Sequence, residues 1–160
     1  MAIEKSEPQI EQPVVRAQEK ALGYLLAEAH GLFRARLTQV LEGSTLHMGH
    51  VVLLSCLFTQ NDLTQVQLVR LARVEKSSVV LFLDALEKDG WIQRRRHPND
   101  RRAHLVHLTD SGRKRFAVIG KALGRAQDEM LAAFGREERT QLESLLLRLI
   151  GQLRDAASSA

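Results

Sequence analysis

The chain has 160 residues and a formal net charge of +4, with 44% hydrophobic and 26% charged residues. This is the balance of an ordinary globular protein of one domain or two small lobes. Its single cysteine, Cys56, excludes an internal disulfide. No apolar run reaches the roughly 18 residues that a membrane-spanning helix needs. With no secretory leader pattern either, we expect a soluble, cytoplasmic protein that contacts no membrane.

The first part of the chain predicts a tail and two helices. Residues 1–12 carry three glutamates and little apolar content, which is typical of a flexible tail. Pro13 suits the first turn of a helix, and apolar residues then recur at helical spacing until Gly43, which is expected to end it. A second helix over 47–59 is apolar on most faces, and such a helix is usually buried.

Two further helices lie close together in the sequence. Thr64 and Gln67 fit a capping box at the start of a short helix over 65–72. Another helix begins near residue 75 and ends at Gly90. A pair of helices joined by so short a turn predicts a helix-turn-helix, whose second helix can lie in a major groove of DNA. The apolar stripe of that second helix consists of Val79, Phe82, Leu83 and Leu86.

A basic hairpin follows. Residues Trp91–Arg96 and Arg102–Leu108 predict two strands, joined by the turn His97-Pro98-Asn99-Asp100. Residues 91–115 hold eight basic and two acidic side chains, so this segment has a charge of +6 and the rest of the chain −2. A cationic patch on a near-neutral body favours a polyanionic partner. A hairpin in this position is a wing, and its arginines suit a narrow, negative minor groove.

The C-terminal part predicts two helices. Thr109 is expected to cap a long helix of about 25 residues that Gly135 ends, and the last helix carries leucines from Leu142 to Leu153. The outer helices hold more apolar surface than one chain is expected to cover, which favours a homodimer. We therefore expect a mainly α fold with a small β-hairpin wing. A DNA-binding lobe at 46–108 would lie between dimerisation helices at 13–45 and 109–160.

One stretch resembles a known family. Residues 63–109 read LTQVQLVRLARVEKSSVVLFLDALEKDGWIQRRRHPNDRRAHLVHLT and resemble the winged helix of MarR-family regulators. Asp100-Arg101-Arg102 followed by Leu108-Thr109 matches the D-x-R…L-T wing signature of that family, and Leu86 to Trp91 resembles its turn into the wing. Over about 15–154 the order of helices is also similar. The resemblance implies a homodimeric DNA-binding regulator, often a repressor, that a small molecule releases from DNA; two-fold symmetry predicts a pseudo-palindromic operator.

The wing supplies most of the predicted DNA contacts. The resemblance makes Arg102 the arginine that enters the minor groove, and gives Asp100 the role of holding a neighbouring arginine in place. The alternative for Arg102 is a solvated surface ion pair. Side chains alternate along a strand, so neighbouring arginines cannot all face DNA. At least one is expected to meet phosphate, unless they only protect a solvated sheet edge from aggregation; the candidates are Arg94, Arg95, Arg96 and Arg101.

The second helix of the helix-turn-helix departs from the family pattern. Relatives commonly carry a polar residue and an arginine where this chain has Val80 and Leu81. These two side chains either touch thymine methyl groups or pack against another part of the protein. Ser77 and Ser78, after Lys76, can donate hydrogen bonds to phosphate or bases. If Val80 and Leu81 do face DNA, we expect weak direct readout and more reliance on the wing and on DNA shape.

A small-molecule site is implied by the resemblance. An arginine near aromatic side chains would suit an organic anion such as an aromatic acid or its thioester, and the alternative is plain core or interface packing. Cys56 is a candidate redox sensor, but its apolar helix favours an inert thiol. His47 and His50 alone make a weak zinc site. The candidate effector residues are Tyr24, His30, Phe33, Arg34, His47, Met48, Val51 and Cys56.

Two other classes of function remain as alternatives. An enzyme is disfavoured because the sequence has no G-x-S-x-G, phosphate-loop or H-E-x-x-H motif, and we assign no catalytic residue, cofactor or metal. A winged helix that binds protein instead of DNA is disfavoured by the arginine-rich wing. A redox- or metal-responsive regulator of the same fold remains an alternative to a ligand-responsive one.

Overall fold

A computed structural model describes residues 21–158 and, within that range, all side chains except those of residues 101 and 102. The predicted tail over 1–12 and the predicted helix start at Pro13 lie outside the described residues. The chain is mainly helical with one small sheet, which confirms the predicted fold class. The elements are α2 (Leu22–Val40), α3 (Met48–Thr59), β1 (Leu63–Thr64), α4 (Gln65–Ala72), α5 (Lys76–Lys88), β2 (Ile92–His97), β3 (Asp100–Leu108), α6 (Asp110–Met130) and α7 (Arg136–Ser158).

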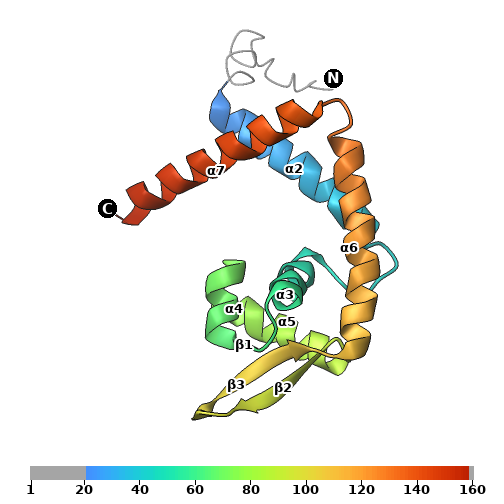
Figure 1. Cartoon of the computed structure of the whole chain (residues 1–160), viewed down its shortest axis with the longest axis vertical. Helices are drawn as coiled ribbons and strands as arrows, with labels where there is room; N and C mark the ends of the chain where they lie inside the picture. Colours follow the sequence, from blue (N-terminus) through green and yellow to red (C-terminus); the bar gives the residue numbers. More distant parts are fainter. Residues whose placement is uncertain (1–20, 159–160) are drawn as a thin grey trace, which may run out of the picture.

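The elements form a compact lobe and an outer group of helices (Figure 1). Helices α3, α4 and α5 and the sheet make up the lobe, with the β2–β3 hairpin at one end of the molecule. Helix α6 runs from the sheet along one side, and α2 and α7 lie at the opposite end from the hairpin. An ion pair of 2.9 Å between Arg36 and Glu129 joins α2 to α6.

The hydrophobic core lies inside the lobe. Helix α3 contributes Leu53, Leu54 and Leu57, which are fully buried, and confirms the expectation of a helix apolar nearly all round. Burial of such apolar surface is the main favourable term in folding. The predicted stripe of α5 is confirmed for three of its four residues, since Phe82 is only partly buried. Those three, with the remaining fully buried residues of the lobe, are Leu63, Leu68, Val79, Leu83, Leu86, Ile92 and Val106.

The sheet has one strand more than the sequence predicted. Its order is β1-β3-β2, and both pairings are antiparallel. The additional strand, β1, has two residues, which is too short for an alternating pattern to show. Leu63 pairs with Val106 on β3, and Ile92 pairs with Leu108. The hairpin is therefore anchored to the start of α4 as well as to the end of α5.

The helix-turn-helix forms as predicted. The Gln67 N–H donates to the Thr64 hydroxyl oxygen at 3.2 Å, and the Thr64 N–H donates to the Gln67 carboxamide at 2.7 Å, which completes the capping box. Helix α4 ends at Ala72, and the φ of 54° at the following residue, Arg73, places it in the left-handed region. A side chain other than glycine costs on the order of 1 kcal/mol there. That conformation turns the chain into α5 within three residues.

Two predicted helix ends are wrong. Helix α2 ends at Val40, and Gly43, with a φ of 80°, lies in the turn beyond it. Helix α6 has 21 residues and ends at Met130, so the predicted length of about 25 is too long. Gly135 belongs to the start of α7, because its N–H donates to the Glu138 carboxylate at 2.7 Å. A glycine marks a turn in a sequence, but not which of its neighbours ends the helix.

The hairpin and α6 meet at a close backbone contact. Thr109 caps α6 as predicted, because its hydroxyl accepts the Gly112 N–H at 2.9 Å and donates to the Gly90 carbonyl at 2.8 Å. Gly112 lies directly against the Trp91 carbonyl, and a Cβ atom at this position would overlap that oxygen. Only glycine therefore fits where α6 leaves the lobe.

We expect Gly112→Ala to destabilise the protein by more than about 1 kcal/mol, since a backbone carbonyl cannot move aside as a flexible side chain can. Gly120→Ala is the matched control on the same helix, where a Cβ meets nothing within 4 Å. The control should stabilise the protein by about 0.5–1 kcal/mol through helix propensity. Urea unfolding at fixed protein concentration measures both. Effects of equal sign in the two variants would contradict the packing described here.

Candidate nucleic-acid interface

Helix α5 has a buried face and an exposed face. The exposed face, as we use the term, consists of Lys76, Ser77, Leu81, Asp84 and Lys88. Ser78 and Val80 lie at its border and are half-buried. Leu81 is 68% exposed, so it does not pack against any described part of the chain. The sequence left two alternatives for Leu81, contact with thymine methyl groups or packing against another part of the protein. Its exposure excludes the second alternative within the described residues of one chain.

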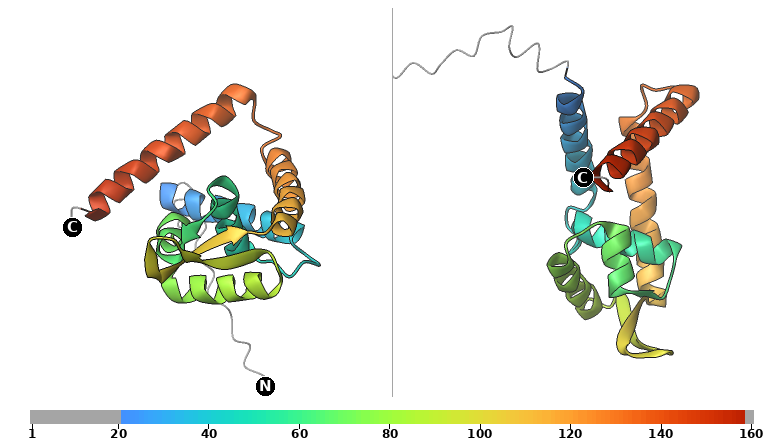
Figure 2. Two further views of the ribbon diagram at one scale, coloured as in Figure 1. Left: turned by 60° about the horizontal axis from the view of Figure 1, so that its bottom comes forward. Right: turned by 90° about the vertical axis from the view of Figure 1, so that its left-hand side faces the viewer.

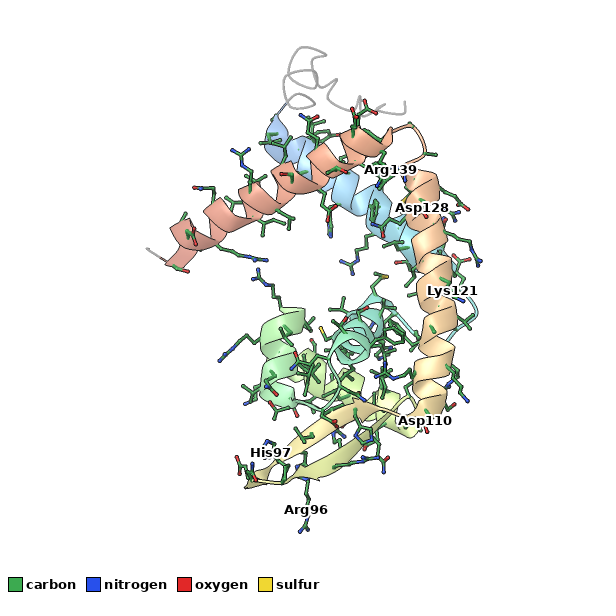
Figure 3. All side chains as sticks on the ribbon, viewed as in Figure 1. Arg96, His97, Asp110, Lys121, Asp128 and Arg139 are labelled. Carbon is green, nitrogen blue, oxygen red and sulfur yellow. The ribbon has the colours of Figure 1, made fainter. Side chains whose placement is uncertain are left out.

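The hairpin extends beside α5 at the same end of the molecule (Figure 2). Arg95 and Arg96 are exposed on β2, and Arg96 points away from the sheet in Figure 3. The pairing shifts between Arg96 and His97 at the tip, where His97 faces Asp100. The side chains of Arg101 and Arg102 lie outside the described residues, so their predicted roles, and the support role of Asp100, stay predictions.

Arg94 has a structural role that the sequence did not predict. Its guanidinium lies 2.6 Å from the Asp84 carboxylate and 2.6 Å from the Glu87 carboxylate. The backbone N–H of Arg94 also donates to the Glu87 carboxylate at 3.0 Å. Charge-assisted bonds of this kind are among the stronger ones in proteins. The half-buried Arg94 thus links β2 to α5, and the prediction that at least one of Arg94, Arg95 and Arg96 contacts phosphate stays a prediction. Strand alternation cannot reveal this, because both partners lie on another element.

A groove that sequence reasoning missed lies between α4, the start of α5 and the sheet. Its volume is about 540 Å³. Two cations, Lys76 and Arg94, stand at its walls, but Arg94 is already neutralised by its carboxylate partners. No local sequence pattern predicts the groove, because the residues that line it come from segments far apart in the sequence. The other lining residues are Thr64, Gln65, Val66, Val69, Ala103, His104 and Val106.

The predicted effector residues lie on α2 and on α3 with its N-cap. Tyr24, His30 and Arg34 are exposed on α2, and Phe33 is half-buried there. Arg34 lines a hollow of about 420 Å³ whose other walls are Gly31, Ala35, Thr38, Gln39 and Glu42, none of them predicted. The three predicted residues of α3 belong to the hydrophobic core, in line with the alternative of plain packing. Val51 is buried in the core, and Met48 and Cys56 are partly buried against the core.

Cys56 and the histidines give little support to redox or metal sensing. Burial raises the pKa of the Cys56 thiol, which disfavours the reactive thiolate. Over residues 21–158 no cluster of three or more histidine, cysteine or carboxylate side chains is arranged to hold a metal ion. His104 is exposed and His107 is buried, as expected for opposite faces of a strand.

His47 and His50 instead form a reciprocal cap at the start of α3. The His47 N–H donates to His50 Nδ1 at 3.3 Å, and the Gly49 N–H donates to His47 Nδ1 at 3.1 Å. Their ring centroids are 3.8 Å apart, and Phe82 of α5 lies edge-on to both rings. An imidazole nitrogen that accepts a hydrogen bond carries no proton, so the bond to His50 Nδ1 favours the neutral form of His50.

The pKa of His50 is lowered to about 4, chiefly because the ring is buried and secondly because of nearby His47, while Asp89 opposes the shift. The folded pKa is below the ordinary value, so the unfolded chain binds a proton that the folded one does not. The contribution of neutral His50 to the stability of the folded chain is therefore fully present above about pH 6.5 and is lost as pH falls toward 4.

We expect the free energy of unfolding to fall by on the order of 2–3 kcal/mol over that window because of His50. His50→Gln should lose this part of the pH dependence, whereas His104→Gln, at an exposed histidine, should keep it. Urea unfolding at a series of pH values measures the difference between the two variants. The assignment fails if His50→Gln shows the same dependence as the unchanged chain.

Comparison with known proteins identifies the family. The family model described as MarR family matches residues 46–104. The HTH-type transcriptional regulator YwoH of Bacillus subtilis, an uncharacterized protein, is 31% identical over 121 residues, which cover 76% of this chain and 87% of that protein. This chain belongs to the MarR family of transcriptional regulators. A second uncharacterized HTH-type regulator of Bacillus subtilis, YdgJ, is 37% identical over 97 residues, but the match spans only 59% of its length.

Solved structures agree with the family. The transcriptional repressor CouR, bound to a 23-mer DNA duplex, is 26% identical and superimposes with a TM-score of 0.79 over 89% of this chain and 99% of that one. A mutant of MarR from E. coli complexed with operator DNA is 25% identical, with a TM-score of 0.73 over 80% and 92% of the two chains. MarR-family proteins are transcriptional regulators and not enzymes. Within residues 21–158, no helix has the length and apolarity to cross a membrane.

Proposed function

We propose that this MarR-family chain is a sequence-specific, homodimeric double-stranded DNA-binding regulator that acts in the cytoplasm. The observation that carries the proposal is that α5 lies beside the hairpin, at the end of the molecule opposite α2 and α7 (Figures 1 and 2), and that both present exposed basic side chains. Each protomer would place α5 in a major groove and the hairpin along the flanking minor groove. We keep the predicted division into a DNA-binding lobe at 46–108 and flanking dimerisation helices as part of this proposal.

The distribution of basic groups supports a DNA-binding hairpin. Of the eight basic residues in 91–115, three serve the fold itself. Arg94 is held by two carboxylates, Arg113 lies over the Phe58 ring and donates to the Phe58 carbonyl, and Arg115 lies over Trp91 and donates to the Asp89 carbonyl. Arg95 and Arg96 are exposed, and neither has an ion pair within the part of the chain that the structure describes. Like charges on a turn repel one another, and phosphate groups would relieve that repulsion.

We expect Arg102→Ala to weaken DNA binding by about 1 kcal/mol or more, the size of a lost charge-assisted hydrogen bond. Lys121→Ala is the control, because it removes the same charge from an exposed site on α6, away from the hairpin (Figure 3). Fluorescence anisotropy on the DNA upstream of the gene, with a random duplex and a salt series, measures binding. Steep salt dependence is expected from several phosphate contacts. Unchanged affinity in Arg102→Ala would remove that residue from the interface.

The outer helices support the homodimer. Helix α7 has 23 residues and is described in full, yet none of them is buried. An exposed apolar stripe of this length is stable only when another surface covers it. A second copy of the chain supplies such a surface, since α2 also exposes Leu22, Leu25 and Leu32. The exposed apolar residues of α7 are Leu142, Leu145, Leu146, Leu147, Ile150 and Leu153.

We expect sedimentation equilibrium to give twice the chain mass of 18.0 kDa. Leu146→Glu should shift the protein toward monomer, because it buries a charge in the proposed interface. Ser144→Glu, which adds the same charge on the opposite side of α7, should leave the dimer intact. A monomeric unchanged chain at micromolar concentration would contradict the homodimer.

We also propose that the protein represses transcription and is released by a small organic molecule. CouR, which has the same fold, is a repressor and was solved on DNA. The hollow at Arg34 and the groove at Lys76 are two candidate binding sites. Aromatic acids and their thioesters, titrated into the same anisotropy assay, should displace the duplex. If none does so, this part of the proposal loses its support while the DNA-binding part stands.

A further inference from the structure

We propose that Leu81, with Val80 beside it, reads C5-methyl groups in the major groove, so that thymine or 5-methylcytosine at one position of each half-site sets the operator preference. This inference rests on the proposed function and specifies how that function selects its sequence. The juxtaposition behind it is an exposed leucine in the middle of the second helix of a helix-turn-helix, next to a basic hairpin.

The exposure of Leu81 calls for a covering surface. At 68% it is among the most exposed large apolar side chains of the described residues, and it lies on the helix that a helix-turn-helix directs at DNA. Val80 is half-buried next to it. The buried stripe of α5, Val79, Leu83 and Leu86, faces the core without Leu81. Leu81 is therefore not part of the hydrophobic core.

Between its two lysines, helix α5 has no side chain suited to read a base by paired hydrogen bonds. Its sequence, KSSVVLFLDALEK, contains no arginine, asparagine or glutamine, which together with lysine are the residues that bind guanine or adenine in bidentate fashion. Its lysines stand at the two ends of the helix. Of the groups that base pairs present in the major groove, only the C5-methyl group is apolar. An exposed leucine at the centre of the helix is complementary to that group.

Charge favours DNA over a protein as the occupant of this face. Asp84, one turn from Leu81, and Glu87 share the guanidinium of Arg94, which lies 2.6 Å from each carboxylate, so these three side chains together carry a formal charge of −1. Lys76 and Lys88, at the two ends of α5, outweigh that charge. Arg95 and Arg96 stand exposed on the adjoining hairpin. The apolar centre is thus bordered by net positive charge, which matches a polyanion with an apolar group in its groove.

The test begins with the full chain and a pool of random duplexes, from which the tightest binders are selected. In the selected duplex, each thymine is replaced in turn by deoxyuridine, which lacks only the methyl group. At one or two positions per half-site we expect an affinity loss of about four-fold for the unchanged chain, the effect of one buried methyl group. Cytosine and 5-methylcytosine at the same position should differ by a similar factor.

The matched variants are Leu81→Ala and Val118→Ala. Both start from side chains that are 68% exposed, but Val118 lies on α6. We expect Leu81→Ala to bind thymine and deoxyuridine duplexes equally, and Val118→Ala to keep the full difference. Circular dichroism and sedimentation of each variant confirm that fold and assembly are unchanged.

Two failures are distinguishable. Selective DNA binding that ignores the methyl group, or a methyl effect that survives in Leu81→Ala, overturns the inference and leaves the proposed function standing. Failure of the pool to yield any duplex bound better than a random one overturns both, and would direct attention to a protein partner for this face.

Discussion

The link between α5 and the hairpin depends on Arg94. Its guanidinium bridges Asp84 and Glu87 on the helix from a position on β2, so the two elements that would touch DNA move as one body. The Arg94 side chain is 25% exposed and the Asp84 side chain 58% exposed, so removal of Arg94 would leave two neighbouring carboxylates without their shared cation at a partly solvated site. A fixed position of α5 relative to the hairpin matters more because α5 has few side chains that could form hydrogen bonds to bases. Apolar contacts do not fix the orientation of a helix as hydrogen bonds do.

The bridge also explains why neighbouring arginines of the hairpin differ in exposure, with Arg94 half-buried and Arg95 and Arg96 exposed. Arg94 is paired with carboxylates of α5. Two further basic residues, Arg113 and Arg115, lie over aromatic rings near the start of α6. The remaining cations are concentrated toward the tip. The cost of bringing like charges together is therefore confined to the region where a minor groove would neutralise them.

The lobe and the outer helices differ in how they are stabilised. The lobe has a continuous core and is connected to α6 through the tight contact between Gly112 and Trp91. Helices α2 and α7 bury none of their described residues. A lobe with its own core, and outer helices without buried residues, suit the proposed homodimer, in which the outer helices of two copies would space two DNA-binding lobes. The His47–His50 pair stands where the two parts join and contacts α5 through Phe82.

The sequence by itself determined the features that depend on near neighbours. The capping box of Thr64 and Gln67, the cap at Thr109 and the buried stripe of α5 follow from hydrogen bonds and periodicities within one or two helical turns. The tertiary structure decided what depends on distant segments. It paired Arg94 with two carboxylates of α5, added β1 to the sheet, placed the two histidines against Phe82, and formed the groove beside Lys76. The physical reason is that a side chain's partner is set by which elements pack together, and local spacing carries no record of that packing.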